Sequence, residues 1–144
     1  MLEIKGLYKT FNPGTVNEKR ALNGVNLTME SGDFITVIGG NGAGKSTLMN
    51  AIAGTWPVDE GSIVIDGVNV TNLPEHKRAT FIGRVFQDPM MGTAATMGIE
   101  ENLALAKRRG KRRTLLPGIV KTERDEYRAL LQTLGLGLET RLTS

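Results

Sequence analysis

The residues with the clearest chemistry are nine consecutive positions, Gly39 to Thr47, which read Gly-Gly-Asn-Gly-Ala-Gly-Lys-Ser-Thr. They fit the pattern G-x-x-x-x-G-K-[ST], in which backbone amides freed by glycine form a nest for phosphate oxygens. In this pattern Lys45 reaches the β- and γ-phosphates of a nucleoside triphosphate, and the Ser46 hydroxyl ligates Mg²⁺. The other predicted ligand contacts are Gly39, Asn41, Gly42, Ala43, Gly44 and Thr47.

The flanking residues predict the elements that hold this loop. Residues 34–38, Phe-Ile-Thr-Val-Ile, are apolar and β-branched enough for a buried strand. Residues 46–53 have the character of a helix, and Gly54 is placed to end it. A helix that begins near Gly44 adds its unpaired amides and the positive end of its dipole. Strand, loop and helix together predict a nucleoside triphosphate site.

Before and after this core, the chain predicts further strands. Apolar residues alternate with polar ones at Leu2, Ile4, Leu22, Val25, Leu27 and Met29. Residues 12–15, Asn-Pro-Gly-Thr, predict the turn between these two strands. Residues 62–70 predict a hairpin around Asp66-Gly67, and residues 81–86 predict another strand.

Helices are expected mainly in the last third of the chain. A short helix is predicted over residues 74–79 with Pro74 at its first position, and a longer one through Ala106 with acidic residues in its first turn. A later helix is predicted with Thr122 as N-cap and Gly135 at its end. Its expected apolar face is Tyr127, Leu130, Leu131 and Leu134. Strands and helices alternating around a phosphate loop indicate an α/β fold.

Composition sets wide limits. A chain of 144 residues predicts one domain with a core of its own, and the absence of cysteine removes disulfides and thiolate metal sites. The N-terminus has no signal-peptide pattern and no apolar run is long enough to cross a bilayer, so a cytosolic chain is expected. The net charge of +3 is too small to indicate nucleic-acid binding by itself.

The positive charge is concentrated in residues 107–113, Lys-Arg-Arg-Gly-Lys-Arg-Arg. Such a run can bind lipid head groups or nucleic-acid phosphates. It contains no aromatic residue on which a base could stack, and a solvated helix end and loop is the favoured interpretation.

Three single residues are assigned structural roles. Asp66 ends an apolar strand as a Mg²⁺-binding carboxylate would, but Gly67 and further apolar residues follow it, so a hairpin turn is the better interpretation. His76 is the single histidine and has no partner ligands nearby in sequence. Trp56 is expected to cap the core beneath the loop helix.

The chain has neither the N-K-x-D nor the D-x-x-G motif of a GTPase, and only its basic run suggests a kinase lid. The order of its features resembles the ATP-binding subunit of ATP-binding cassette (ABC) transporters along nearly the whole chain. The matching features are Phe11, the Walker A loop 39–47, the hairpin 59–67, Gln87 at the end of Val85-Phe86-Gln87-Asp88, and the segment 97–103, Met-Gly-Ile-Glu-Glu-Asn-Leu.

The resemblance implies further site roles. Phe11 would stack on adenine, with Tyr8 as the alternative if the register is shifted. Gln87 would correspond to the Q-loop glutamine, whose amide oxygen contacts Mg²⁺ or the attacking water and whose backbone joins the core to the helices. Lys45 and Gln87 would therefore be the catalytic residues, and Ser46 and Gln87 the metal ligands.

The implied fold is a P-loop NTPase with an ABC-type core sheet, an antiparallel β subdomain and the start of a helical subdomain. Residues 1–95 would hold the core and β subdomain, and residues 96–144 the beginning of the helical subdomain. The implied cofactors are ATP and Mg²⁺. The implied partners are a second ATP-binding subunit, as a homodimer, and membrane permease subunits that hold the protein at the inner face of the membrane.

The family also uses a Leu-Ser-Gly-Gly-Gln signature, an Asp-Glu Walker B strand and a switch histidine, none of which occurs in this sequence. The resemblance therefore implies the N-terminal part of an ABC ATPase, which binds ATP with negligible turnover. The alternatives are a soluble P-loop NTPase, either a nucleotide kinase or a cassette ATPase acting on nucleic acid or ribosomes, and a nucleotide-dependent interaction module.

Overall fold

The computed structural model describes residues 1–111 and 118–143. The chain forms two compact units, of which the first covers residues 1–83 and the second begins at Arg84. Within the described residues, no helix is both long enough and apolar enough to cross a membrane.

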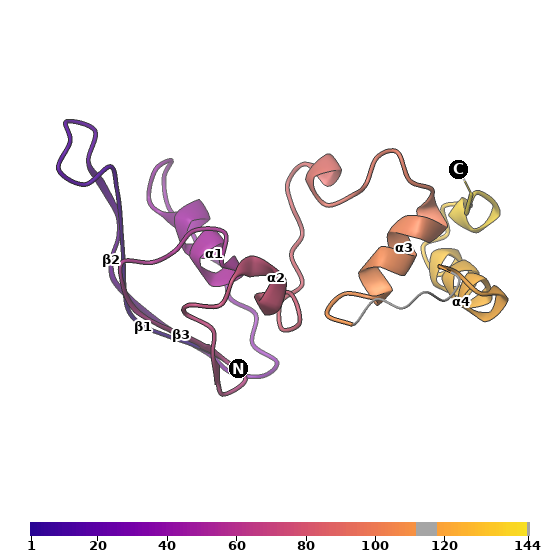
Figure 1. Cartoon of the computed structure of the whole chain (residues 1–144), viewed down its shortest axis with the longest axis horizontal. Coiled ribbons are helices and arrows are strands. Elements are labelled where there is room, and N and C mark those ends of the chain that lie inside the picture. The colour runs from indigo at the N-terminus through magenta and orange to yellow at the C-terminus, as the bar shows by residue number, and fades with distance from the viewer. Residues whose placement is uncertain (112–117, 144) are drawn as a thin grey trace. The chain divides into compact units, whose positions relative to one another are not determined.

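The first unit is built on an antiparallel sheet with the strand order β2-β1-β3-β4. Its strands are β1 (Leu2–Phe11), β2 (Lys19–Met29), β3 (Glu60–Ile65) and β4 (Val68–Asn69). The strands and turns predicted for residues 1–29 and 62–70 are therefore confirmed. β1 lies between β2 and β3, so the N-terminal strand is held on both of its edges (Figure 1).

Asp66 and Gly67 form the turn between β3 and β4. Both have positive φ angles, 48° and 79°, which is the backbone geometry of a type I′ hairpin turn. The Asp66 carboxylate accepts a hydrogen bond from the amino group of Met1 at 2.7 Å. The sequence-based assignment of Asp66 to a turn is thus confirmed.

Two helices lie on one side of this sheet, α1 (Lys45–Ala53) and α2 (Glu75–Arg78) (Figure 1). α1 begins and ends where the sequence predicted, with Gly44 and Gly54 as its caps, whereas Pro74 is the N-cap of α2 and not its first residue. The core between sheet and helix consists of Ile4, Leu7, Leu22, Leu48, Ala51, Ile63, Ile65 and Val70. Burial of this apolar surface is what fixes α1, and with it the phosphate loop, against the sheet.

The strands predicted over residues 34–38 and 81–86 are wrong for this structure, because both segments lack regular secondary structure. Several of their apolar side chains are exposed, with Phe34 at 93%, Ile38 at 89% and Val85 at 97% relative exposure. A buried strand needs neighbouring strands for its amides and carbonyls. None of the described strands pairs with either segment.

The second unit contains α3 (Ile99–Lys107), α4 (Lys121–Gln132) and two 3-10 turns, η1 (Pro89–Met91) and η2 (Leu138–Thr140). Its core is Ala104, Tyr127, Leu131 and Leu142. Glu100 of α3 accepts two hydrogen bonds from the guanidinium of Arg124 of α4, at 2.7 and 2.9 Å.

Several details of α4 differ from the prediction. Val120 and not Thr122 is the N-cap, and its amide donates to the Glu123 carboxylate at 3.1 Å. Glu123 thus reaches back to the backbone amide of the N-cap residue, as the N3 residue of a capping box does. Leu130 and Leu134 are more than half exposed, and the helix ends at Gln132, before Gly135. Of the expected apolar face, only Tyr127 and Leu131 are buried.

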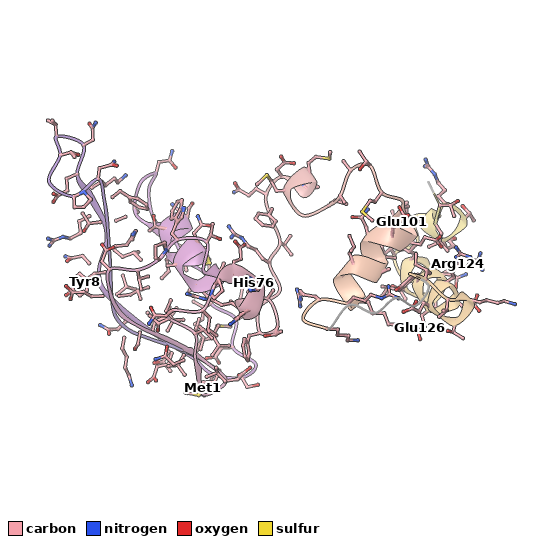
Figure 2. The ribbon with its side chains drawn as sticks, viewed as in Figure 1. Met1, Tyr8, His76, Glu101, Arg124 and Glu126 are labelled. Carbon is pink, nitrogen blue, oxygen red and sulfur yellow. The ribbon has the colours of Figure 1, made fainter. Side chains whose placement is uncertain are left out.

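The start of the basic run is paired with acidic residues of α4, which Figure 2 shows beside α3. Lys107 forms an ion pair with Glu126, and Arg108 forms one with Glu123 at 3.0 Å. These two cations therefore support the packing of α3 on α4. Arg112 and Arg113, the end of the run, lie outside the described residues.

Candidate phosphate-binding site

The loop before α1 has the backbone geometry of an anion nest. The φ angle is positive at Gly42 (80°) and Gly44 (87°) but not at Asn41 or Ala43, so its sign alternates along four residues. Alternation of this kind turns successive N–H groups toward one side of the chain. The Ala43 amide donates to the Gly40 carbonyl at 3.3 Å, which tightens the turn.

α1 supplies the second part of this site. Its first i−4 bond runs from the Leu48 amide to the Gly44 carbonyl at 2.8 Å, so the amides of residues 45–47 precede the hydrogen-bonded ladder. No side chain caps this end of the helix. The free amides and the helix dipole together favour an anion at this position.

Lys45 and Ser46 are the first two residues of α1. The Lys45 ammonium donates to the carbonyls of Gly39 and Gly40 at 2.5 and 2.8 Å, which holds it against the backbone of the loop. Ser46 is exposed, whereas Thr47 is buried at 8% relative exposure. Of the two residues that follow Lys45, only Ser46 is exposed to a ligand in solution.

Gly44 is required by both space and conformation. A Cβ at this position would lie 2.4 Å from the carbonyl oxygen of Ala21, and its φ of 87° disfavours any L side chain. The loop is therefore seated directly on the first residues of β2. Sequence reasoning predicted the loop but not this contact.

Phe11 ends β1 and is partly buried. Its ring meets the ring of Trp56 edge to face, with 5.1 Å between centroids and 81° between planes, and the Lys9 ammonium lies 5.6 Å from the Phe11 centroid. Trp56 thus supports Phe11 rather than only covering the core. The Tyr8 hydroxyl instead lies beside Gly24 of β2, 2.8 Å from the position that a Cβ on this glycine would occupy.

Asp59 fixes the end of β1 that carries Phe11. Its carboxylate accepts hydrogen bonds from the Thr10 amide at 2.6 Å and from the Lys9 ammonium at 3.1 Å. The Thr10 amide, with a further contribution from Lys9, holds the pKa of Asp59 below its ordinary value. The sequence analysis did not predict this role for Asp59, which directly precedes β3.

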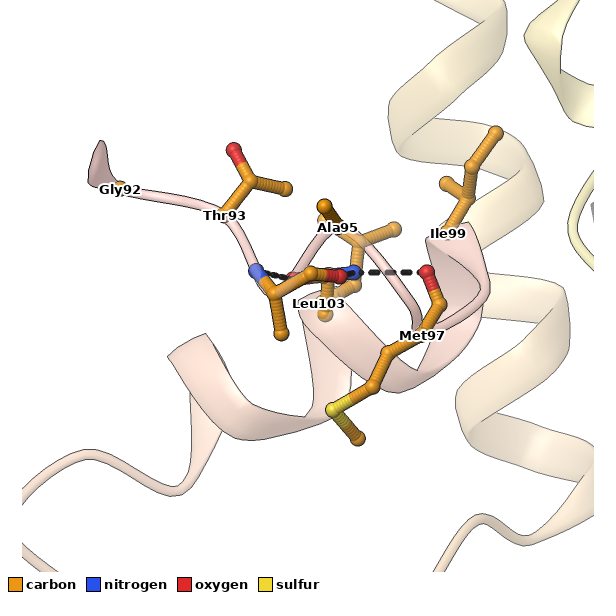
Figure 3. Close-up of a pocket in the computed structure, with 8 residues that line it drawn as sticks. Gly92, Thr93, Ala95, Met97, Ile99 and Leu103 are labelled. Atoms are coloured by element: carbon orange, nitrogen blue, oxygen red, sulfur yellow. Dashed lines mark hydrogen bonds between the residues drawn. The ribbon is translucent and has the colours of Figure 1, made fainter. Parts of the chain in front are cut away.

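Gln87 belongs to the second unit. It is exposed and lies two residues before η1, whose N-cap, Asp88, accepts a hydrogen bond from the Met90 amide on its carboxylate at 2.9 Å. The second unit also holds a pocket of ≈ 300 Å³, shown in Figure 3. Its lining residues are Gly92, Thr93, Ala94, Ala95, Met97, Ile99, Asn102 and Leu103.

Asn102 of α3 organises the loop that forms this pocket. Its side-chain amide donates to the carbonyls of Ala94, Met97 and Gly98 at 3.0–3.1 Å, and its carbonyl accepts from the Ala94 amide at 2.9 Å. One partly buried side chain therefore satisfies four backbone groups of residues 94–98. No sequence motif had indicated this role.

With the geometry established, comparison with known proteins identifies the class. The ABC transporter family profile matches residues 22–143, and the chain therefore belongs to the ABC transporter family. Among curated relatives, the tyrosine transport ATP-binding protein of Clostridioides difficile (strain R20291) is 44% identical over 112 residues, which cover 77% of this chain and 44% of the relative. The macrolide export ATP-binding/permease protein MacB of Hyphomonas neptunium (strain ATCC 15444) is 35% identical over 143 residues, 95% of this chain and 20% of the relative.

Solved structures that resemble this chain are also ATP-binding cassettes. A dimeric ATP-binding cassette in a post-hydrolysis state bound to ADP and Pi has a TM-score of 0.75 and 27% identity, with 99% of this chain and 60% of that chain covered. The fold class predicted from the sequence is confirmed as a P-loop ATPase cassette with an antiparallel β sheet. The chain spans less than half the length of these two curated relatives.

Members of this family generally bind ATP with Mg²⁺ and hydrolyse it in the complete protein. Their cassettes act as dimers with membrane permease components. The residues of the loop fit this pair of ligands, because the alternating backbone and the helix amides suit a polyphosphate and Ser46 offers the hydroxyl oxygen that Mg²⁺ accepts. The alternative of a soluble kinase or nucleic-acid ATPase is not favoured by these relatives.

Proposed function

We propose that this chain is the ATP-binding part of an ABC transporter and binds Mg²⁺-ATP at residues 39–47. The proposal rests on one arrangement: an anion nest leads into an uncapped helix N-terminus, and the loop packs on β2 at Gly44. The Lys45 ammonium bonds to the carbonyls of the same loop. The phosphates would lie on the amides of Gly39, Asn41, Gly42, Ala43, Gly44 and Thr47, with Lys45 as the catalytic cation and Ser46 on the metal. Adenine would stack on Phe11, which Trp56 supports from the side.

Calorimetry with Mg²⁺-ATP tests this proposal. The 144-residue chain should release heat that saturates, and Lys45→Ala should weaken binding at least about tenfold because a phosphate-binding charge is lost. Lys77→Ala, an exposed lysine of α2, is the control. Saturable binding that survives Lys45→Ala unchanged would show that the nucleotide sits elsewhere.

For residues 1–144 we propose binding without significant turnover. The chain keeps Lys45, Ser46 and Gln87 but has no Asp-Glu strand to complete the metal shell and orient water. Phosphate release by the chain should equal that of Lys45→Ala in a malachite-green assay. Release clearly above that background would refute this part.

We further propose that the surface from Gln87 to Met97 contacts a membrane permease, and that the complete protein works as a homodimer at the inner face of the membrane. The support is the ≈ 300 Å³ pocket lined by residues between Gly92 and Leu103, together with the exposed side chains of Met90 and Met91. Residues 96–144 would then begin the helical subdomain that responds to the nucleotide through Gln87.

The transported solute is not assigned. Relatives of comparable identity are named for tyrosine, spermidine and putrescine, and macrolides. Co-purification with a permease tests the docking surface. Ala95→Arg, at the pocket, should abolish the association, while Leu105→Arg, on an exposed part of α3, should preserve it.

A further inference from the structure

A second lysine lies beside the phosphate loop. Lys19 is the first residue of β2 and pairs with Phe11 across the sheet. A Cβ built on Gly42 would lie 3.1 Å from the Lys19 ammonium nitrogen, so this charge reaches the middle of the loop. The G-x-x-x-x-G-K-[ST] pattern does not include Lys19, which is separated from the loop by 19 residues.

The sheet holds this lysine in place. Ala21 lies two residues further along β2, and its carbonyl oxygen would be 2.4 Å from a Cβ on Gly44. A methyl group of Leu22 would be 3.5 Å from the same Cβ. Leu22 is itself buried in the core. The start of β2 therefore runs along the loop, and pairing with Phe11 of β1 holds the backbone of Lys19.

The Lys19 charge has no acidic partner within residues 1–111 and 118–143. Lys9, on the neighbouring strand, pairs with Asp59, and the Lys45 ammonium bonds to loop carbonyls. Lys19 thus has three donors available and lies where the loop amides already favour an anion.

We propose that Lys19 is a second phosphate-binding cation of this site, which contacts the polyphosphate of the nucleotide from the β2 side of the loop while Lys45 contacts it from the helix side. The inference rests on the proposed nucleotide function. It adds a ligand-binding residue that the loop motif alone does not supply. A compact ammonium suits a phosphate oxygen as a point charge, and a guanidinium at the same position would serve as well.

The test compares Lys19→Gln, Lys19→Arg and the control Lys77→Gln in calorimetric titrations with Mg²⁺-ATP. Lys19→Gln should raise Kd about fivefold, the effect of one exposed charge-assisted contact. It should also lower the salt dependence of binding, since one cation fewer meets the polyphosphate. Lys19→Arg should restore Kd to within about twofold, and Lys77→Gln should match the unmodified chain.

The outcomes separate the two proposals. If Lys45→Ala abolishes binding while Lys19→Gln binds as Lys77→Gln does, the Lys19 inference is wrong and the nucleotide site stands. A loss in Lys19→Gln that Lys19→Arg does not repair also overturns it, because the role would then be structural. If the unmodified chain binds no Mg²⁺-ATP, both proposals fail.

Discussion

The guanidinium of Arg78 donates a hydrogen bond to the Ala51 carbonyl at 2.7 Å, so a residue of α2 caps the C-terminal end of α1. The same side chain donates to Ile52, Leu73 and Thr71 carbonyls at 2.8–2.9 Å. Arg78 is only 2% exposed, and burial lowers the pKa of its guanidinium, which remains charged at any ordinary pH. A positive charge at this end of α1 complements the helix dipole, whose other end forms the proposed phosphate site.

Replacement of Arg78 should therefore destabilise the first unit strongly. Arg78→Met keeps much of the volume but leaves several carbonyls without a donor, and we expect a loss of about 3 kcal/mol in the free energy of unfolding. Lys77→Met, at the exposed neighbouring position, should change it by less than about 0.5 kcal/mol. Urea unfolding followed by Trp56 fluorescence measures both, and equal midpoints for the two variants would contradict the capping role.

Gly44 offers a second test, because its place on Ala21 is both close and conformationally demanding. Gly44→Ala should cost at least about 2 kcal/mol, from the left-handed backbone and from the contact with the Ala21 carbonyl. Gly40→Ala has nothing within 4 Å of its new Cβ and should leave the unfolding midpoint nearly unchanged. Thermal unfolding of both variants decides. A Gly44→Ala chain as stable as Gly40→Ala would mean that the loop is not seated on β2 as described.

The local parts of this structure were predictable from the sequence. The glycine spacing and the helix that ends at Gly54 depend on neighbours along the chain, and so does the Asp66-Gly67 turn, whose two positive φ angles these residue types favour. Each of these was predicted correctly. The phosphate loop belongs to the same group, since its backbone pattern follows from Gly42 and Gly44.

Features that depend on distant partners were not predictable. Residues 34–38 have the composition of a strand, but a strand also requires a neighbour, which composition does not reveal. Arg78 follows Glu75-His76-Lys77 and looks like one more surface charge. Its burial depends on contacts with α1, where the Ala51 and Ile52 carbonyls that it bonds lie 27 and 26 residues earlier in the sequence. Lys19 and Asp59 were missed for the same reason.

Asp59 should make stability depend on pH in a defined direction. Because its folded pKa is below the ordinary value of 3.8, its contribution is fully present above that pH and is lost as the pH falls through the folded pKa. Asp59→Asn keeps an acceptor for Thr10 but loses the charge, and the carboxylate is 42% exposed, so we expect a loss of only about 0.5–1 kcal/mol near neutral pH.

Urea unfolding of the chain and of Asp59→Asn at a series of pH values measures this effect. The difference between them should be constant from about pH 7 to pH 5 and shrink below about pH 4. Glu60→Gln, the adjacent exposed carboxylate, is the control. A difference that grows toward acid pH would have the wrong sign for a carboxylate stabilised in its charged form.

Asn102 provides a prediction for the second unit, where one side chain holds residues 94–98. Asn102→Asp preserves the size and the acceptor for the Ala94 amide but removes the donor to three carbonyls and places a negative charge beside them. The loop should loosen by about 2 kcal/mol, so hydrogen exchange at the Ala94 and Met97 amides should accelerate by roughly tenfold or more. Asn72→Asp makes the same chemical change at an exposed position and should leave exchange in residues 94–98 unaltered.

Ala94, Ala95 and Met97 also line the pocket proposed for the permease. Asn102→Asp should therefore weaken the association with the permease without altering the Kd for Mg²⁺-ATP. Weaker nucleotide binding with an undisturbed loop would place the role of Asn102 in the nucleotide site instead.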